Sequence, residues 1–151
     1  MGDKVVFTQD AIKSKTIQPS PKESAKAKAK SKFRQDYPFE KRRAEALRIL
    51  DKHPGRVPVI VEVAHTEKNL PKLEKCKYIV PKDITLSQFL CIIRKNLKLS
   101  EAQALFMFVG DNVIPPISTT IGILYDEYHE EDFFMLAIIC SENCFGSCFS
   151  S

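Results

Sequence analysis

The sequence predicts an α+β fold: a four-stranded mixed sheet crossed by one long helix, with two extra helices on the N-terminal side. Residues 133–140 are apolar at every position, which is typical of a strand buried on both faces in the middle of a sheet. A helix-capping pattern opens a long apolar-periodic segment between the expected second and third strands. Residues 1–31 contain too few apolar side chains to form a core, so the fold should begin near Phe33.

The basic charge of the chain belongs to this N-terminal extension. The formal net charge is +4, but residues 1–32 hold eight lysines against three acidic residues, or +5, so the remainder carries −1. The composition favours a solvated leader, with contact of the leader to an anionic membrane, to microtubules or to nucleic acid as the alternative. Because the folded part is nearly neutral, our prediction for the protein is that nucleic acid is not among its partners.

The cysteines and histidines indicate neither a metal site nor an enzyme. No transmembrane segment or signal peptide is recognisable, so we expect the chain in the reducing cytoplasm with its five cysteines as free thiols. Cys140, Cys144 and Cys148 are evenly spaced, but they include no C-x-x-C element and no neighbouring histidine. The three histidines stand in turns and polar loops, and the spacing indicates no nucleophile–histidine–acid set.

The first long helix is expected from Phe39 to Leu50, with Pro38 at its start and a His-Pro-Gly turn after it. Four apolar residues are assigned to its core-facing stripe: Phe39, Ala46, Leu47 and Leu50. Glu45 and Ile49 then form a second face beside that stripe. In this interpretation Ile49 is not required for the core.

Two strands should follow, over residues 57–63 and 77–80. In the first strand four valines alternate with Pro58, Ile60 and Glu62, so the two sets lie on opposite faces of the sheet. The second strand stops at Pro81. Lysines flank it, as expected of an exposed edge strand.

The long crossing helix begins at the capping box Thr85-x-x-Gln88. Its core stripe is assigned to four residues: Leu86, Leu90, Ile93 and Leu97. Phe89 and Ile92 are left over on its flank. A third strand (105–109), a Gly-Asp-Asn turn, a short helix (about 120–128) and the central strand complete the chain. This order is that of the ubiquitin-like β-grasp, with an added N-terminal helical layer over the face that ubiquitin leaves open.

Five segments of the chain carry a family resemblance. They are Tyr37-Pro-Phe-Glu-Lys-Arg-Arg-Ala-Glu45, Arg56-Val-Pro-Val-Ile-Val-Glu62, Lys75-Cys-Lys-Tyr-Ile-Val-Pro81, Asn112-Val-Ile-Pro-Pro116 and His129-Glu-Glu-Asp-Phe-Phe134. Together and in this order they resemble the autophagy ubiquitin-like modifiers, most closely the branch of the GABA-receptor-associated protein. The resemblance covers about residues 33–146 and ends on Phe145-Gly146, where that family ends its mature form.

The resemblance implies that a dedicated cysteine protease cleaves the Gly146-Ser147 bond, with Phe145 anchoring the tail beside it. Activating and conjugating enzymes would then join Gly146 to phosphatidylethanolamine, and no other cofactor is implied. Glycine suits such a position because, without a Cβ atom, it enters a narrow enzyme channel. The implied organisation is a basic extension (1–31), a ubiquitin-like domain (32–146) and a discarded peptide (147–151). The modifier would lie on autophagosome and cytoplasmic vesicle membranes.

The family also implies a site for the motif aromatic-x-x-aliphatic of autophagy receptors, which adds a strand to the sheet edge and fills two pockets. The first pocket would be lined by Glu45, Ile49, Pro58, Ile60, Lys77, Ile79 and Phe134. The second would be lined by Tyr78, Val80, Pro81, Phe89 and Ile92. Arg94 is implied as a further binding residue, whereas Asn96 stands where relatives carry an arginine. Two alternatives stay open: an adaptor that binds the same peptides without lipidation, and prenylation at Cys148.

Overall fold

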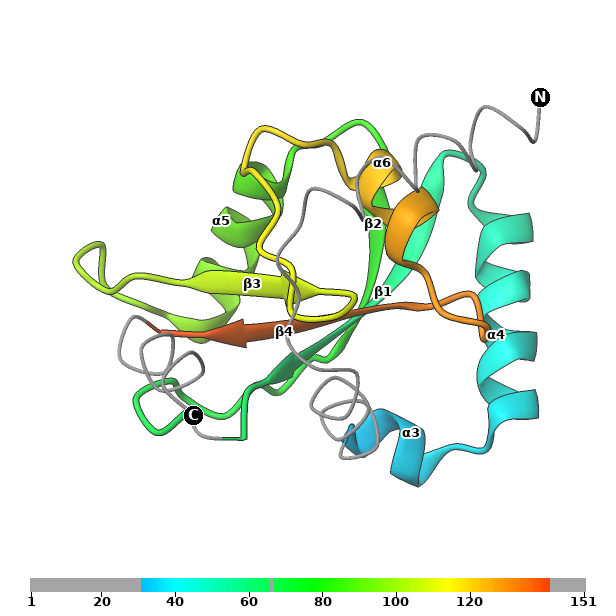
Figure 1. Ribbon diagram of the computed structural model, residues 1–151, viewed down its shortest axis with the longest axis horizontal. Helices are drawn as coiled ribbons and strands as arrows, with labels where there is room; N and C mark the ends of the chain where they lie inside the picture. Colours follow the sequence, from blue (N-terminus) through cyan, green and yellow to red (C-terminus); the bar gives the residue numbers. More distant parts are fainter. Residues whose placement is uncertain (1–30, 66, 142–151) are drawn as a thin grey trace.

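The computed structural model describes residues 31–65 and 67–141, and its strands form one mixed sheet in the order β2-β1-β4-β3 (Figure 1). The strands are β1 (Arg56–Val63), β2 (Lys77–Pro81), β3 (Phe106–Val109) and β4 (Met135–Cys140). β1 pairs antiparallel with β2 and parallel with β4, and β3 pairs antiparallel with β4. The predicted four-stranded mixed sheet is confirmed.

The apolar strand β4 lies between β1 and β3, as its composition predicted. Five of its six residues are buried. The strand begins at Met135 rather than Phe133, because Phe133 has a left-handed backbone with φ of 67°. The Phe133 amide there donates to the Glu130 carbonyl at 3.0 Å and closes a turn. The strand therefore starts two residues later than the apolar run.

The helices of the described residues all have counterparts among the predicted elements. They are α3 (Lys32–Asp36), α4 (Phe39–Lys52), α5 (Leu86–Leu97) and α6 (Ile121–Tyr128). The predicted capping box of Thr85 and Gln88 opens α5. α4 packs on the face of β1 that carries Ile60, and α5 packs on the opposite face (Figure 1). No helix in the described part of the chain is both long enough and apolar enough to cross a bilayer.

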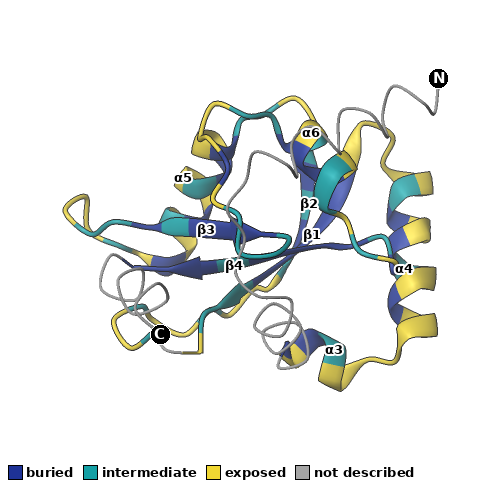
Figure 2. Ribbon diagram, viewed as in Figure 1, coloured by how far each residue is buried: buried dark blue, intermediate teal, exposed yellow. Residues whose placement is uncertain are grey.

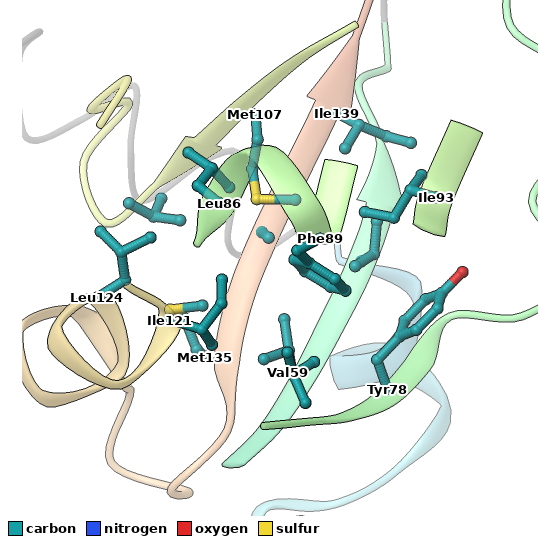
Figure 3. Close-up of a cluster of buried hydrophobic side chains, with 14 of the residues drawn as sticks. Val59, Tyr78, Leu86, Phe89, Ile93, Met107, Ile121, Leu124, Met135 and Ile139 are labelled. Atoms are coloured by element: carbon teal, nitrogen blue, oxygen red, sulfur yellow. The ribbon is translucent and has the colours of Figure 1, made fainter. Parts of the chain in front are cut away.

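The larger core lies between the sheet and the helices α5 and α6. Figure 3 shows Val59 of β1 and Met135 of β4 among the side chains that α5 and α6 contribute. The rings of Tyr78 and Phe89 meet edge to face with their centroids 5.5 Å apart. Figure 2 shows buried residues concentrated in the strands and exposed residues along the outer sides of the helices. The sheet is therefore covered on this face, as the predicted central position of β4 requires.

A smaller core lies between the N-terminal helices and the other face of the sheet. Its buried members are Phe33, Ala46, Ile49, Ile60, Phe134 and Leu136. The Glu62 carboxylate of β1 accepts hydrogen bonds from the Ser31 hydroxyl at 2.9 Å and from the Phe33 amide at 3.0 Å. Ser31, assigned above to the extension, is thus the buried N-cap of α3. Ser31 therefore packs with the domain.

The predicted core stripes of both long helices need correction. In α4 the buried residues are Arg42, Ala46 and Ile49, whereas Phe39 and Leu47 are 39% and 38% exposed. Positions i, i+4 and i+7 do form one helical stripe, but a charged residue occupies its first position. The interpretation of Ile49 as a residue not required for the core is therefore wrong.

In α5 the buried residues are Leu86, Phe89, Ile93 and Leu97, and Leu90 is only partly buried. Phe89 and Leu90 both have helical spacing from Leu86, so periodicity alone does not choose between them. The edge-to-face contact with Tyr78 decides in favour of Phe89. Phe89 is a core residue and was wrongly left on the flank.

Arg42 is buried because it pairs with Asp132 from the turn before β4. Arg42 Nε lies 3.3 Å from Asp132 Oδ2, and the two side chains are 9% and 4% exposed. Asp132 Oδ1 also accepts a hydrogen bond from the Phe134 amide at 3.0 Å. The pair ties the N-terminal helical layer to the entrance of the central strand.

Arg42→Ala should lower the free energy of unfolding by about 3 kcal/mol, because the Asp132 carboxylate would stay buried without its cation. Arg48→Ala, at an exposed position of the same helix, is the matched control and should change stability by less than about 0.5 kcal/mol. Urea unfolding of both variants measures the difference. Equal stabilities would mean that the buried pair does not hold the helical layer in place.

Candidate functional site

Among the described strands, β2 pairs only with β1 and lies at the edge of the sheet. Its outer side therefore presents backbone hydrogen-bonding groups. The Cys76 carbonyl accepts from Val61 at 2.7 Å, and the Lys82 amide donates to Gly55 at 2.9 Å. An antiparallel ladder alternates with period two, so the even-numbered residues of β2 bond to β1. Lys77 and Ile79 therefore direct their amide and carbonyl groups outward. Pro58, which has no N–H, stands opposite Ile79, in agreement with this assignment.

The apolar residues predicted for the first pocket lie together on the α4 face of β1 and β2. Ile49, Ile60 and Phe134 belong to the smaller core, and Ile79 packs against it. Pro58 is buried beside Ile79 in the register of the two strands. The structure thus brings together residues from α4, two strands and the turn before β4.

Lys77 and Phe33 cover this apolar set. Lys77 Nζ pairs with the Glu45 carboxylate and lies 6.0 Å from the centroid of the Phe33 ring. The Phe33 ring in turn meets Phe134 edge to face with centroids 5.1 Å apart. Ile49, Ile60 and Phe134 are buried and therefore offer little surface to a ligand in this structure. Sequence reasoning missed Phe33, whose apolar side chain at the start of the fold was the one available signal.

Four of the five residues predicted for the second pocket lie on the opposite face, and three of these are core residues. Pro81 alternates with Val80 along β2 and therefore shares the face of Ile79. Tyr78, Val80 and Phe89 are members of the larger core with exposures of 4% or less. Ile92 is 42% exposed, and Pro81 is half-buried. Exposed apolar surface among the predicted residues on this face therefore comes from Ile92.

Polar groups surround the Tyr78 ring at one end of β2. The Asn96 amide donates a hydrogen bond to the Tyr78 hydroxyl at 2.9 Å. Lys75 Nζ lies 4.9 Å from the centroid of the Tyr78 ring. The Arg94 guanidinium donates to the Ser100 carbonyl at 3.3 Å, within its own helix-to-loop segment. Lys75 thus places a positive charge beside the edge strand, whereas the charge of Lys77 is paired with Glu45.

The predicted conjugation residues Phe145 and Gly146 lie outside the described residues. The last described residue, Ser141, is buried, and its amide donates to the Glu67 carboxylate. Burial raises the pKa of Glu67, whereas hydrogen bonds from Ser141, Asn69 and Leu70 lower it. Together the hydrogen bonds outweigh burial, so the pKa of Glu67 lies below its ordinary value. Sequence reasoning missed this contact, because no local pattern relates residues 74 positions apart.

A separate stack of rings lies between α6 and the turn before β4. Ring centroids are 5.0 Å apart for Tyr125 and His129, and 5.7 Å apart for His129 and Phe133. Burial, together with the charges of Asp126 and Asp132, raises the pKa of Tyr125 to about 12, and its hydroxyl donates to the Phe133 carbonyl. The stack holds the turn in place. Among the described residues, no group of His, Cys, Asp and Glu side chains is arranged to hold a metal ion.

Comparison with known proteins gives the same family at three levels. The family model described as "Autophagy protein Atg8 ubiquitin like" matches residues 41–146. Proteins called Autophagy-related protein 8 from Neosartorya fischeri and Aspergillus niger are each 44% identical over 119 residues, which is 79% of this chain and 99% of theirs. The crystal structure of Trypanosoma brucei ATG8 matches with a TM-score of 0.70 and 31% identity, over 74% of this chain and 95% of that chain.

These similarities agree with the ordered motifs and with the mixed sheet in which β4 is central. They do not single out the branch of the GABA-receptor-associated protein, which stays a prediction. The matched residues make up more than two thirds of the chain. The chain belongs to the Atg8 family of autophagy-related ubiquitin-like proteins.

Proposed function

We propose that this chain is a modifier whose Gly146 is joined to phosphatidylethanolamine after a cysteine protease removes residues 147–151. The observation that carries the proposal is that the family match ends on Gly146 itself, six residues beyond the end of β4. Activating and conjugating enzymes would perform the chemistry. The contribution of this protein is a glycine carboxylate at the end of a short segment, presented by a folded domain.

The attached lipid would supply the membrane affinity. Burial of acyl chains is worth about 0.8 kcal/mol per CH₂ group, and two chains anchor a domain stably where one gives marginal binding. The protein would thus lie in the cytoplasm before conjugation and on autophagosome and vesicle membranes after it.

We also propose that the edge of β2 recruits receptors that carry an aromatic-x-x-aliphatic motif. In an extended peptide, residues i and i+3 point to opposite faces, because side chains alternate with period two. A peptide paired with Lys77 and Ile79 would therefore place one anchor on the α4 face and the other on the α5 face. The smaller core and the Ile92 surface stand on those two faces. This geometry explains why one short motif would need two pockets.

Ile79→Pro should abolish binding of such a peptide while leaving the domain folded. The outward N–H of Ile79 is the donor that the peptide strand would use, and proline is tolerated where an edge strand faces solvent. Ile79→Ala is the matched control, since it removes a similar part of the side chain but keeps the N–H. We expect the alanine variant to retain measurable affinity and the proline variant to lose at least roughly tenfold more.

Fluorescence anisotropy with a labelled motif peptide measures both affinities, and circular dichroism confirms folding. A double change of Tyr78 and Ile79 to alanine is a poorer test, because Tyr78 is only 4% exposed and its loss would damage the core. Equal affinities of Ile79→Pro and Ile79→Ala would show that the peptide does not pair with this edge. The unlipidated adaptor would be favoured by two results together: the protein binds motif-bearing receptors in cells, and intact-mass measurement finds no lipidated form of it.

A further inference from the structure

The chain leaves the sheet at a point that Glu67 holds in place. One carboxylate oxygen of Glu67 accepts the Ser141 amide, and the other accepts the Asn69 amide at 2.6 Å. The Glu67 amide donates to the Ala64 carbonyl at 3.0 Å, and the Ala64 amide donates to the Ile139 carbonyl at 3.0 Å. The segment after β1 therefore bonds to the chain on both sides of Cys140, the last residue of β4: to Ile139 before it and to Ser141 after it.

The segment that carries Glu67 is itself anchored to the domain. The Gln103 side chain donates to the Asn69 carbonyl at 3.1 Å, and Leu70 packs against the larger core. Ser141 is only 4% exposed, so its amide needs a partner within the protein. Glu67 supplies this partner from a position that the rest of the fold determines.

We propose that Glu67 is a positioning residue for the conjugation segment. By holding the Ser141 amide, it fixes the place and direction of the chain at Ser141, ahead of the glycine that the processing and conjugating enzymes would use. The inference rests on the proposed role of Gly146. Beyond that role, it assigns to Glu67, a residue distant from Gly146 in the sequence, control over how Gly146 is presented to the enzymes.

The length of the segment explains why its starting direction matters. Gly146 is five positions after Ser141, and five extended residues span at most roughly 17 Å. The direction at Ser141 thus decides which part of an enzyme surface Gly146 reaches. A fixed starting point also removes orientations that an enzyme would otherwise have to select, which lowers the entropy lost on binding.

Glu67→Ala in the full-length chain should raise the KM for cleavage after Gly146 about fivefold and leave kcat within about twofold, since the scissile bond is unchanged. The probe is purified cysteine protease that trims Atg8 proteins. Glu67→Gln keeps one side-chain carbonyl and can hold only one of the two amides, so its KM should be intermediate. Lys68→Ala, at the exposed neighbouring position, is the control and should match the parent.

An insertion separates positioning from general damage to the fold. Gly-Ser-Gly placed between Ser141 and Glu142 frees the segment from the direction set at Ser141. In that background Glu67→Ala should raise KM no further, whereas a purely structural defect would add to it. The ¹⁵N–¹H resonance of Ser141 should also shift in Glu67→Ala, because the hydrogen bond to its amide is lost. The variant should remain folded, with a melting temperature above the assay temperature.

Two results would overturn the inference in distinguishable ways. If the parent is cleaved after Gly146 and Glu67→Ala has the same KM and kcat, Glu67 does not position the segment and the proposed function stands. If the parent is not cleaved after Gly146, the proposed function and the inference both fail. An additive effect of Glu67→Ala in the insertion variant would likewise reject positioning.

Discussion

Leu136→Asp is expected to unfold the domain at room temperature. Leu136 lies on the central strand β4, is 9% exposed, and belongs to the smaller core with Ile49 and Ile60. The substitution removes about 1.5–3 kcal/mol of side-chain burial. It also places an unpaired carboxylate in an apolar site, and a buried charge without its partner costs about 3–5 kcal/mol. The sum is comparable to the whole stability of a typical domain, about 5–15 kcal/mol.

Leu47→Asp is the matched control for this prediction. Leu47 was assigned to the core stripe of α4 from the sequence, but it is 38% exposed. Its change to aspartate should cost less than about 1 kcal/mol, which lowers the melting temperature by a few degrees. Circular dichroism melting curves measure both variants. A folded Leu136→Asp, or an unfolded Leu47→Asp, would contradict the arrangement of these side chains.

The strands were predictable because their apolar patterns depend on position in the sheet. A run that is apolar at every position is favourable only where both faces are covered, and β4 is such a strand. In β1 the alternation of valines with Pro58, Ile60 and Glu62 correctly separated the two faces, which now carry the two cores. Because side chains of a strand alternate with a period of two, assigning one residue to a face also assigns all the others.

The helix faces were harder, because tertiary partners decided between alternatives of equal spacing. Arg42 is buried and forms an ion pair with Asp132, which no local sequence pattern predicts. The stripe assigned from apolar residues alone left out both Arg42 and Ile49, which are buried together with Ala46. In α5 the choice between Phe89 and Leu90 depended on the position of the Tyr78 ring. Both errors concern contacts between residues far apart in the chain.

The sequence predicted which residues lie around β2, but it did not predict which of their side chains are accessible. Edge position, flanking lysines and the family motifs brought together the residues around β2. The sequence did not show that Phe33 and Lys77 cover the first set, or that Tyr78 and Phe89 are core residues. Accessibility results from packing of the whole N-terminal layer, so it follows only from the assembled fold.

Gly146→Ala should abolish trimming after residue 146 and, with it, attachment of the lipid. The physical reason is the added Cβ atom, which would clash in an enzyme channel fitted to glycine and restrict the backbone angles available there. Intact-mass measurement of the protein from cells is the direct readout. The parent should lose residues 147–151 and gain the mass of a phospholipid, whereas Gly146→Ala should keep the full-length mass. Ser147→Ala is the control and should be trimmed normally.

Two truncations separate the steps that Gly146 would serve. A chain that ends at Gly146 should bypass the protease and still receive the lipid, while a chain that ends at Phe145 should stay unlipidated and keep peptide binding at β2. Cys148→Ser tests the remaining alternative, since a prenylated chain would depend on that thiol. Membrane attachment that survives Gly146→Ala but is lost in Cys148→Ser would reject conjugation through glycine. Attachment that survives Cys148→Ser and is lost in Gly146→Ala would instead place the lipid at the residue where the family match ends.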